Sequence, residues 1–355
     1  MEGDEQSRAQ ERQVDGDNGQ GEEEEDEDEE GEGMVVDEEE RKRVLETQAA
    51  SRDEELWPDE VEVPLDTPAR VRFARYRGLK SLRTSPWDPK ENLPLDYARI
   101  FHFENIRRAQ DRAIRASAAG VKAGTYVTLH IANFPAARLD EVDVRGAGAR
   151  AVVIGGLLQH ENKTTVLNFV IQKHPSYTLP VKNKDIVEIH CGNRRFTSSV
   201  LLSEHTQRSD KHKMERFLNP SRFTVASIYG PVTYPPAPAA FFKLAPDGTR
   251  QLVATGTLLS VDPDRIVLKK IVLCGHPIKV HKSRAVIRYM FHNSEDVRWF
   301  KPVQIWTKYG RTGHIREHLG THGYMKCQFD AMIRTDDTVC MSLYKRVYPK
   351  WNQPS

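Results

Sequence analysis

From residue 121 to the carboxyl end, short runs of branched and aromatic apolar residues alternate with polar ones. Val127, Leu129 and Ile131 show this period of two in the first run, and similar runs recur as far as residues 338–348. A period of two places alternate side chains on opposite faces of a strand. Gly, Pro and Asn separate the runs with residues suited to tight turns. The pattern predicts a mainly β fold with two antiparallel β-barrel-like domains, residues 121–220 and 221–351.

Only a few short helices are expected. Four apolar residues recur near helical spacing before Gly120, namely Ile106, Ala109, Ala113 and Ile114. They predict a helix over 104–118, within a helical segment 101–120. A second short helix is predicted over 210–218, closed by Asn219 and Pro220, and the boundary between the two barrel domains is placed after it.

Acidic residues dominate the amino-terminal part of the chain. Residues 1–66 contain 28 Asp and Glu against 6 Lys and Arg, a net charge of −22, and Glu22 to Glu30 are all acidic. Because few apolar side chains are there to be buried, residues 1–56 are expected to form a disordered acidic leader. A helix over 38–52 would be marginal in isolation.

The other 289 residues carry 46 basic and 23 acidic groups, a net charge of +23. Such a surplus attracts polyanions, because each Lys or Arg that neutralises a phosphate releases condensed counterions. A surplus of Lys and Arg is also common on surfaces that only solvent covers. Charge alone therefore leaves both interpretations open.

An arm, residues 57–100, contains six prolines, which forbid a continuous helix and disfavour a central strand. Phe73, Tyr76 and Trp87 lie among six cations, Arg70, Arg72, Arg75, Arg77, Lys80 and Arg83. Rings for base stacking and cations for phosphate occur together where proteins follow single-stranded RNA. The alternative is an arm whose rings pack on a neighbouring domain while its arginines face solvent. No core element is expected from this proline-rich sequence.

Further basic residues are assigned to the same RNA-binding surface. They are Arg107, Arg108, Arg194, Arg195, Lys211, Lys213, Lys308, Arg311, Lys345 and Arg346. Each small cluster alone is typical of a solvated face, but together they match the positive charge of this part of the chain.

The sequence offers no machinery for nucleotide hydrolysis. Next to Lys80 and Ser81, the glycine that should immediately precede the lysine of a phosphate-binding loop is missing, as is the preceding strand. Residues 183–185, Asn-Lys-Asp, lack the spacer of a guanine-reading motif and are interpreted as a turn. We expect neither an enzyme activity nor a cofactor.

Metal binding is also not expected. Three histidines recur every four residues before a cysteine, and on a helix they would align as zinc ligands: His314, His318, His322 and Cys327. Glycines interrupt this stretch, which favours a polar loop. Cys274 and His276 lack an acid nearby to orient them, so they are not interpreted as a nucleophile pair.

The spacing of the cysteines and the hydropathy pattern predict the cellular compartment of the protein. The four cysteines have no short spacing, so we expect reduced thiols. No secretory signal and no apolar run of about 18 residues are present, so a soluble intracellular protein without a membrane partner is expected.

Several long strings resemble a known family. They are RYRGLKSLRTSPWDPKENLPLDYARIFHFEN, HCGNRRFTSSVLLSEHT, DKHKMERFL, ATGTLLSVDPDRIVLKKIVLCGHP and WFKPVQIWTKYGRTGHIREHLGTHGYMKCQFD, with LYKRVYPKW near the end. Together they resemble the carboxy-terminal half of the Tsr-type pre-rRNA-processing proteins, in the Bms/Tsr ribosome biogenesis family. The resemblance covers about Trp57 to Trp351.

The resemblance implies barrels of the kind found as accessory domains of translational GTPases, in a branch without working GTPase residues. It implies action in small (40S) subunit maturation in the nucleus and nucleolus, with shuttling to the cytoplasm. The implied partners are the pre-ribosomal particle, the 18S rRNA precursor and ribosomal proteins. The implied mechanism is that of a placeholder, which delays premature engagement by translation factors or the large subunit.

The family's GTPase-like domain and the barrel after it are expected to be missing. The chain is then a fragment, an incomplete gene model or a short isoform. A second hypothesis is an acidic chaperone, whose leader shields basic ribosomal proteins or the basic barrels themselves. A GTPase is the third hypothesis and the one that the motifs disfavour.

Overall fold

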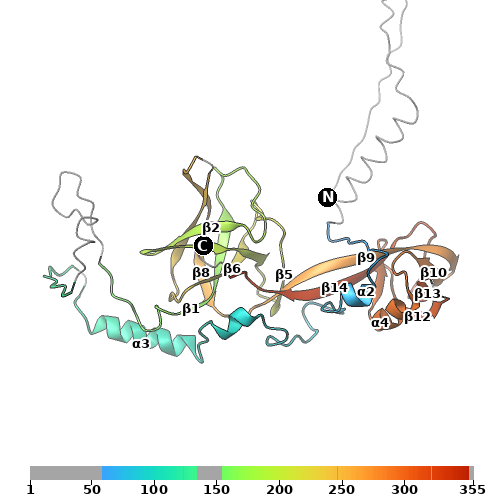
Figure 1. Ribbon diagram of the computed structural model, residues 1–355, viewed down its shortest axis with the longest axis horizontal. Helices are drawn as coiled ribbons and strands as arrows, with labels where there is room; N and C mark the ends of the chain where they lie inside the picture. The colour runs from blue at the N-terminus through green and yellow to red at the C-terminus, as the bar shows by residue number, and fades with distance from the viewer. Residues whose placement is uncertain (1–57, 123, 134–153, 246, 321, 352–355) are drawn as a thin grey trace, which may run out of the picture. The chain divides into compact units, whose positions relative to one another are not determined.

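The computed structural model describes residues 58–351 apart from residues 123, 134–153, 246 and 321. All described elements belong to one compact unit that begins at Trp57. Two seven-stranded sheets make up most of this unit, with few helices (Figure 1). The mainly β fold expected from the alternating pattern is confirmed. The expected acidic leader and the helix over 38–52 lie outside the described residues.

The first sheet is antiparallel throughout, in the order β3-β2-β7-β8-β1-β6-β4. Its strands are β1 (Thr164–Lys173), β2 (Ile186–Cys191), β3 (Arg194–Ser199), β4 (Leu201–Glu204), β6 (Thr224–Pro231), β7 (Pro238–Leu244) and β8 (Arg250–Val261). They enclose one core around Phe169, Ile189 and Phe241. Gly256 allows β8 to approach β1, because a Cβ there would lie 2.1 Å from the carbonyl oxygen of Val170.

The second sheet closes on itself, because β9 pairs with both β14 and β10. The ring consists of β9 (Ile266–His281), β10 (Arg284–Arg288), β13 (Tyr324–Phe329), β12 (Thr312–Leu319), β11 (Ile305–Thr307) and β14 (Val339–Val347). β5 (Lys211–Lys213) lies outside the ring as a parallel neighbour of β9. Helix α4 (Ser294–Phe300) contributes Val297 and Phe300 to the core of this barrel.

The sheets do not divide the chain where the sequence predicted. Apart from β5, the change from the first sheet to the second falls between Val261 and Ile266 and not at residue 220, because β6, β7 and β8 are hydrogen-bonded neighbours in the sheet of β1. The helix predicted over 210–218 is wrong. Residues 211–213 form β5 instead, since their backbone pairs with Ile266 to Leu268 of β9.

Three other local predictions have mixed outcomes. The helix over 104–118 is confirmed as α3 (Ile106–Ala118), whose first turn is capped by the Asn105 side chain. The strand expected from the alternation of Val127, Leu129 and Ile131 does not form. The polar loop predicted around His314 is strand β12, which pairs with β13. Among the described residues, no helix is long and apolar enough to cross a membrane.

The arm contributes to the core of the second barrel, which corrects the prediction that it would not. Ala69 and Phe73, in and beside the short helix α2 (Ala69–Arg72), are buried among the barrel's apolar side chains. The carboxylate of Asp296 accepts hydrogen bonds from the backbone N–H groups of Ala69 (2.9 Å) and Arg70 (3.2 Å). Because Pro68 cannot cap the helix with a side chain, this buried carboxylate takes that role.

The remaining residues of the arm pack along the two sheets. Trp87 packs on Ile266 and Leu268 of β9. Beyond it, η1 (Leu95–Ala98) buries Tyr97 against Tyr229 of β6 and Tyr348 after β14. The rings of the arm therefore pack on neighbouring elements, as the alternative interpretation predicted.

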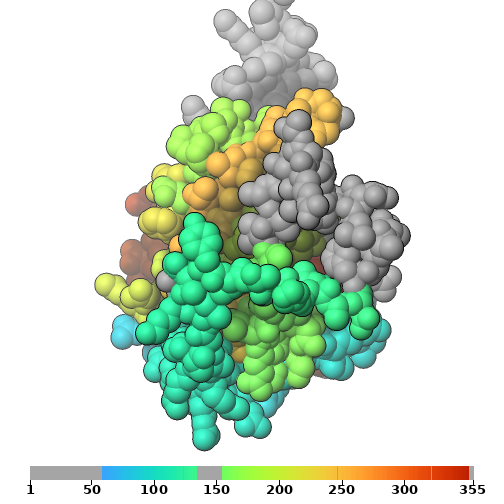
Figure 2. Space-filling view, turned by 90° about the vertical axis from the view of Figure 1, so that its left-hand side faces the viewer, coloured from blue at the N-terminus to red at the C-terminus, as the bar shows by residue number. Residues whose placement is uncertain are grey.

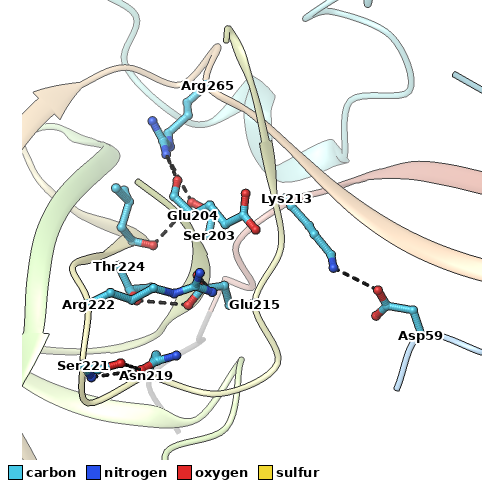
Figure 3. Close-up of polar contacts among 11 residues, drawn as sticks. Asp59, Ser203, Glu204, Lys213, Glu215, Asn219, Ser221, Arg222, Thr224 and Arg265 are labelled. Atoms are coloured by element: carbon cyan, nitrogen blue, oxygen red, sulfur yellow. Dashed lines mark hydrogen bonds and ion pairs between the residues drawn. The ribbon is translucent and has the colours of Figure 1, made fainter. Parts of the chain in front are cut away.

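Polar contacts link the first sheet to β5 and β9 (Figure 3). The Arg265 guanidinium donates to the Ser203 hydroxyl (3.3 Å) and to the Glu204 carbonyl (3.2 Å), so the start of β9 is bound to β4. Lys213 of β5 forms an ion pair with Asp59 of the arm at 3.0 Å. This junction holds three parts of the chain together through side chains.

Burial shifts the pKa values of three groups at the junction. Burial, and after it the charge of Arg265, lowers the pKa of His212 to about 4. Burial lowers the pKa of Arg265 to about 10. Burial raises the pKa of Glu215, although the neighbouring Arg222 and Thr224 favour its charged form (Figure 3). The junction is thus most stable with a neutral imidazole.

Replacing Phe73 with Ala should lower the free energy of unfolding by about 3–5 kcal/mol, because the ring is buried in the barrel core. Denaturant titration of the purified chain measures the change. Val71→Ala on the same helix is the matched control, since Val71 is 62% exposed and should cost little. Equal effects of the two substitutions would mean that the arm is not part of the core.

Stability should fall as the pH decreases from about 6.5 to about 4. The folded pKa of His212 lies below its unfolded value, so in this window the unfolded chain binds a proton that the folded chain excludes. The loss from this group reaches about 3 kcal/mol at most. Asp210, which favours the charged imidazole, and His205, which opposes it, face the same ring.

The measurement compares unfolding of the unsubstituted chain and of His212→Asn across this pH range. The variant should show a shallower decline. Glu215 acts in the opposite direction, because a raised carboxyl pKa favours folding as the pH falls, so Glu215→Gln should steepen the decline. Parallel curves for the unsubstituted chain and His212→Asn would contradict the assignment.

Candidate nucleic-acid interface

A basic cleft of about 680 Å³ lies between the arm and the end of β14. Its walls come from arm residues 75–95, from Lys184 in the turn before β2, and from residues 345–350. Six cations line it, namely Arg75, Arg77, Lys184, Lys345, Arg346 and Lys350. Glu91 is the one acidic residue among the described residues that line it. A cavity of this charge is suited to an anion.

Backbone contacts bring these cations together from distant parts of the sequence. Arg77 and Tyr344 exchange backbone hydrogen bonds of 3.0 and 2.8 Å, so the arm lies antiparallel beside β14. Lys184 occupies a turn with a φ of 72°, and its N–H donates to the Val200 carbonyl at 2.7 Å. The turn predicted at 183–185 is confirmed, and it presents Lys184 to the cleft.

The cations in the cleft repel one another. Partial burial, and then the charges of Lys350, Lys269 and Lys345, lower the pKa of Lys184. Partial burial, and then Arg75 and Lys269, lower the pKa of Lys345. A bound phosphate would relieve this repulsion, since an opposite charge favours the charged form of each lysine. The electrostatics of the cleft therefore favour an anionic ligand.

Two arginines of the cleft are held by the protein itself. The Arg77 guanidinium lies 3.6 Å from the centre of the Trp87 ring and 3.0 Å from the Glu91 carboxylate. Arg346 is buried and donates to the backbone carbonyls of Pro89 and, at 3.5 Å, of Pro263. These two side chains shape the cleft, while Arg75, Lys184, Lys345 and Lys350 have the charges available to a ligand.

The structure separates the other predicted RNA-binding residues into two groups. Five are engaged with acidic partners: Arg70 with Glu295, Arg194 with Glu161, Lys211 with Asp210, Lys213 with Asp59 and Lys308 with Glu60. Seven are exposed: Arg72, Lys80, Arg83, Arg107, Arg108, Arg195 and Arg311. Only Arg75, Arg77, Lys345 and Arg346 of the predicted set meet in the cleft.

Helix α3 carries a second basic surface. Arg108, Arg112 and Arg115 follow one another at helical spacing and are exposed, while Ala109 and Ala113 are buried on the other side. In Figure 2 the helix and the residues after it, in teal, lie at the front of the molecule. Sequence reasoning singled out Arg107 and Arg108 but missed Arg112 and Arg115, which the i, i+4, i+7 spacing could have found.

Sequence reasoning also missed Lys184 and Lys350, neither of which has a basic residue directly beside it in the sequence. The structure does not gather the histidines discussed for zinc. Within the described ranges, the one group of three potential ligands with atoms within 4.8 Å of one another is Glu60, Cys274 and Cys340. The Lys308 ammonium lies 3.0 Å from the Glu60 carboxylate and neutralises it.

Comparisons with known proteins place this mainly β chain, with its basic cleft, among ribosome biogenesis proteins. The family model described as "40S ribosome biogenesis protein Tsr1 and BMS1 C-terminal" matches residues 61–349. The chain belongs to this family. The resemblance stated from the sequence strings is confirmed.

Similar curated proteins carry the same description. The chain is 51% identical over 320 residues to the "Pre-rRNA-processing protein TSR1 homolog" of Homo sapiens and 51% identical to that of Mus musculus. It is 48% identical over 318 residues to the Drosophila melanogaster homolog. Each match covers 89% of this chain and 39% of the relative, so the chain spans about two fifths of the relatives' length.

Among solved structures, translation elongation factor SelB from Methanococcus maripaludis matches in its apo form with a TM-score of 0.46 and 15% identity. The match covers 52% of this chain and 42% of that chain. Its complex with a GTP analogue matches with a TM-score of 0.42.

Replacing Arg75, Lys184, Lys345 and Lys350 together with Ala should weaken RNA binding and make it less sensitive to salt. If all four meet phosphates, the slope of log affinity against log salt should become shallower by about 3, at roughly 0.7 per contact. Titrations of a labelled RNA at several salt concentrations measure it.

The matched control replaces Lys184, Lys345 and Lys350 with Arg, which preserves charge and should preserve the slope. Both variants should melt close to the temperature of the unsubstituted chain, which shows that they remain folded. An unchanged slope in the alanine variant would place the RNA contacts elsewhere, with the exposed arginines of α3 as the next set to replace.

Proposed function

We propose that this chain acts in small (40S) subunit biogenesis and in processing of the 18S rRNA precursor, by binding RNA and ribosomal proteins on the pre-ribosomal particle. Membership of the Tsr1 and BMS1 family supports the process. The names of the relatives, pre-rRNA-processing proteins, support the kind of RNA. The proposed location is the nucleus and nucleolus, with shuttling to the cytoplasm on pre-ribosomes.

The observation that carries RNA binding is the gathering of cations from three distant segments into one cleft. Arg75, Lys184 and Lys345 meet there although more than 100 residues separate each from the next. Holding like charges together opposes folding, so their proximity calls for an anionic partner. RNA is the polyanion that fits both this charge and the family.

The proposed role is that of a placeholder and not of a catalyst. The sequence lacks a phosphate-cradling loop. The side chains of the cleft are cations, aromatic rings, aliphatic groups and the Asn92 amide around the single carboxylate of Glu91, which forms an ion pair with Arg77. A protein with this surface occupies RNA and so delays other factors from binding there.

Crosslinking of the tagged chain to RNA in cells, followed by sequencing of the attached fragments, tests the proposal. Fragments of the small-subunit rRNA and of its precursor should be enriched. The variant with Arg75, Lys184, Lys345 and Lys350 replaced by Ala should recover fewer of them at equal protein level. Enrichment of unrelated RNAs, equal for both proteins, would contradict the proposal.

The charge of the amino-terminal part supports a second candidate function, a chaperone of basic ribosomal proteins, since residues 1–66 have a net charge of −22. The same crosslinking on a chain without residues 1–56, combined with identification of the ribosomal proteins that copurify, separates the two. The assembly function predicts retained or stronger RNA recovery, because negative charge that competes with RNA is removed. The chaperone function predicts loss of its principal activity, seen as loss of the copurifying ribosomal proteins, which the assembly function predicts to be retained.

A further inference from the structure

The basic cleft is lined by apolar side chains as well as by cations. Four aliphatic residues contribute to it: Leu93, Pro94, Leu95 and Val347. The Leu95 side chain is 93% exposed and that of Leu93 is 40% exposed. Two leucines open to water next to a cation cluster are not explained by the packing of the arm, which Tyr97 and Trp87 anchor.

Polar groups that can recognise the edge of a nucleobase also line the cleft. Asn92 lines the cleft with a φ of 53°, and its side-chain amide donates to the Glu91 carboxylate at 3.3 Å. An amide offers an acceptor and N–H donors, and a carboxylate accepts from the N–H groups of a base. A phosphate has no N–H to donate to a carboxylate, whereas an unpaired uracil can donate its ring N–H to the carboxylate and accept from the amide with its carbonyl oxygens.

A double helix does not fit this arrangement. Proteins that bind duplex RNA contact phosphates and 2′-hydroxyl groups across a wide, shallow groove, with the bases paired inside. The exposed leucines would then meet only polar backbone. An unstacked base presents two apolar faces, and proteins that bind single strands combine such a face with a cationic groove for the backbone. A cleft of about 680 Å³ also has the size of a small-molecule site.

We infer that the basic cleft holds an unpaired nucleotide of single-stranded RNA, with its base against Leu93 and Leu95 and its phosphates on Lys184, Lys345 and Lys350. The inference rests on the proposed RNA-binding function and specifies the form of RNA. Glu91 and Asn92 face the edge of the base. Arg77 is a positioning residue, because its ring contact with Trp87 and its ion pair hold Glu91 in place.

The test compares two probes on the full chain by fluorescence anisotropy. One is a labelled oligouridylate of about ten nucleotides, within the usual site size for a single strand. The other is the same strand paired with oligoadenylate. The single strand should bind more tightly than the duplex. Replacing Leu93 and Leu95 together with Ser should weaken single-strand binding about tenfold and leave duplex binding unchanged.

Leu65→Ser is the matched control, since Leu65 is an exposed leucine of the same arm that does not line the cleft. A second measurement does not depend on any variant. An oligouridylate that carries one thio-substituted uracil is crosslinked by light, and the attached peptide is identified by mass spectrometry. Crosslinks should fall within residues 91–95 or 345–350.

The outcomes separate the two claims. Equal binding of strand and duplex, no effect of the leucine substitutions, or crosslinks confined to other peptides would overturn the unpaired-nucleotide site and leave the proposed function standing. Absence of binding to either probe at low salt would overturn the proposed RNA-binding function itself. Tighter strand binding, with the leucine effect and crosslinks in the cleft, supports both.

Discussion

The pairing of β9 with β14 is the constraint on which the rest of the described structure depends. Nine consecutive residue pairs join the two strands, from Val347 opposite Val267 to Val339 opposite Gly275, and Figure 1 shows them side by side. On the other side of β14, β11 pairs only as far as Met341, and Arg77 of the arm takes the next place at Tyr344. The same ladder therefore closes the barrel, fixes the arm and sets one wall of the basic cleft. Lys345 lines the cleft because it directly follows Tyr344, the residue of β14 that pairs with Arg77 of the arm.

The cleft combines side chains that the protein itself holds in place with cations that can contact a ligand. Trp87, Arg77 and Arg346 are fixed by ring contacts, an ion pair and backbone carbonyls, so they define its shape. Lys184 and Lys345 are held near like charges, and partial burial together with these charges lowers their pKa values. A site of this kind has its shape before a ligand binds. Bringing the cations together destabilises the fold, and a bound polyanion offsets part of that cost by neutralising their charges.

Sequence predicts those features of this chain that local patterns determine. Helix α3 and most strands were found because apolar spacing and a glycine stop are local signals. Residues 211–213 were predicted as helix but form β5, since the backbone of β9 supplies partners that no local pattern reveals. Proline content predicted an arm outside the core, yet Phe73 is buried because Asp296, far along the chain, caps α2. Likewise Lys345 was visible in a basic pair, whereas Lys184 and Lys350 acquire their role only through three-dimensional proximity.

The capping of α2 by Asp296 has a consequence for the order of events during synthesis. The two partners are 227 residues apart, so the arm leaves the ribosome long before the carboxylate that fixes it exists. Closing so long a loop costs entropy that only later contacts repay, and domains generally fold as they emerge. The first sheet can form while the arm is still unattached. The cleft is completed only after translation has passed Lys345, so a nascent chain cannot capture RNA there before both barrels have been made.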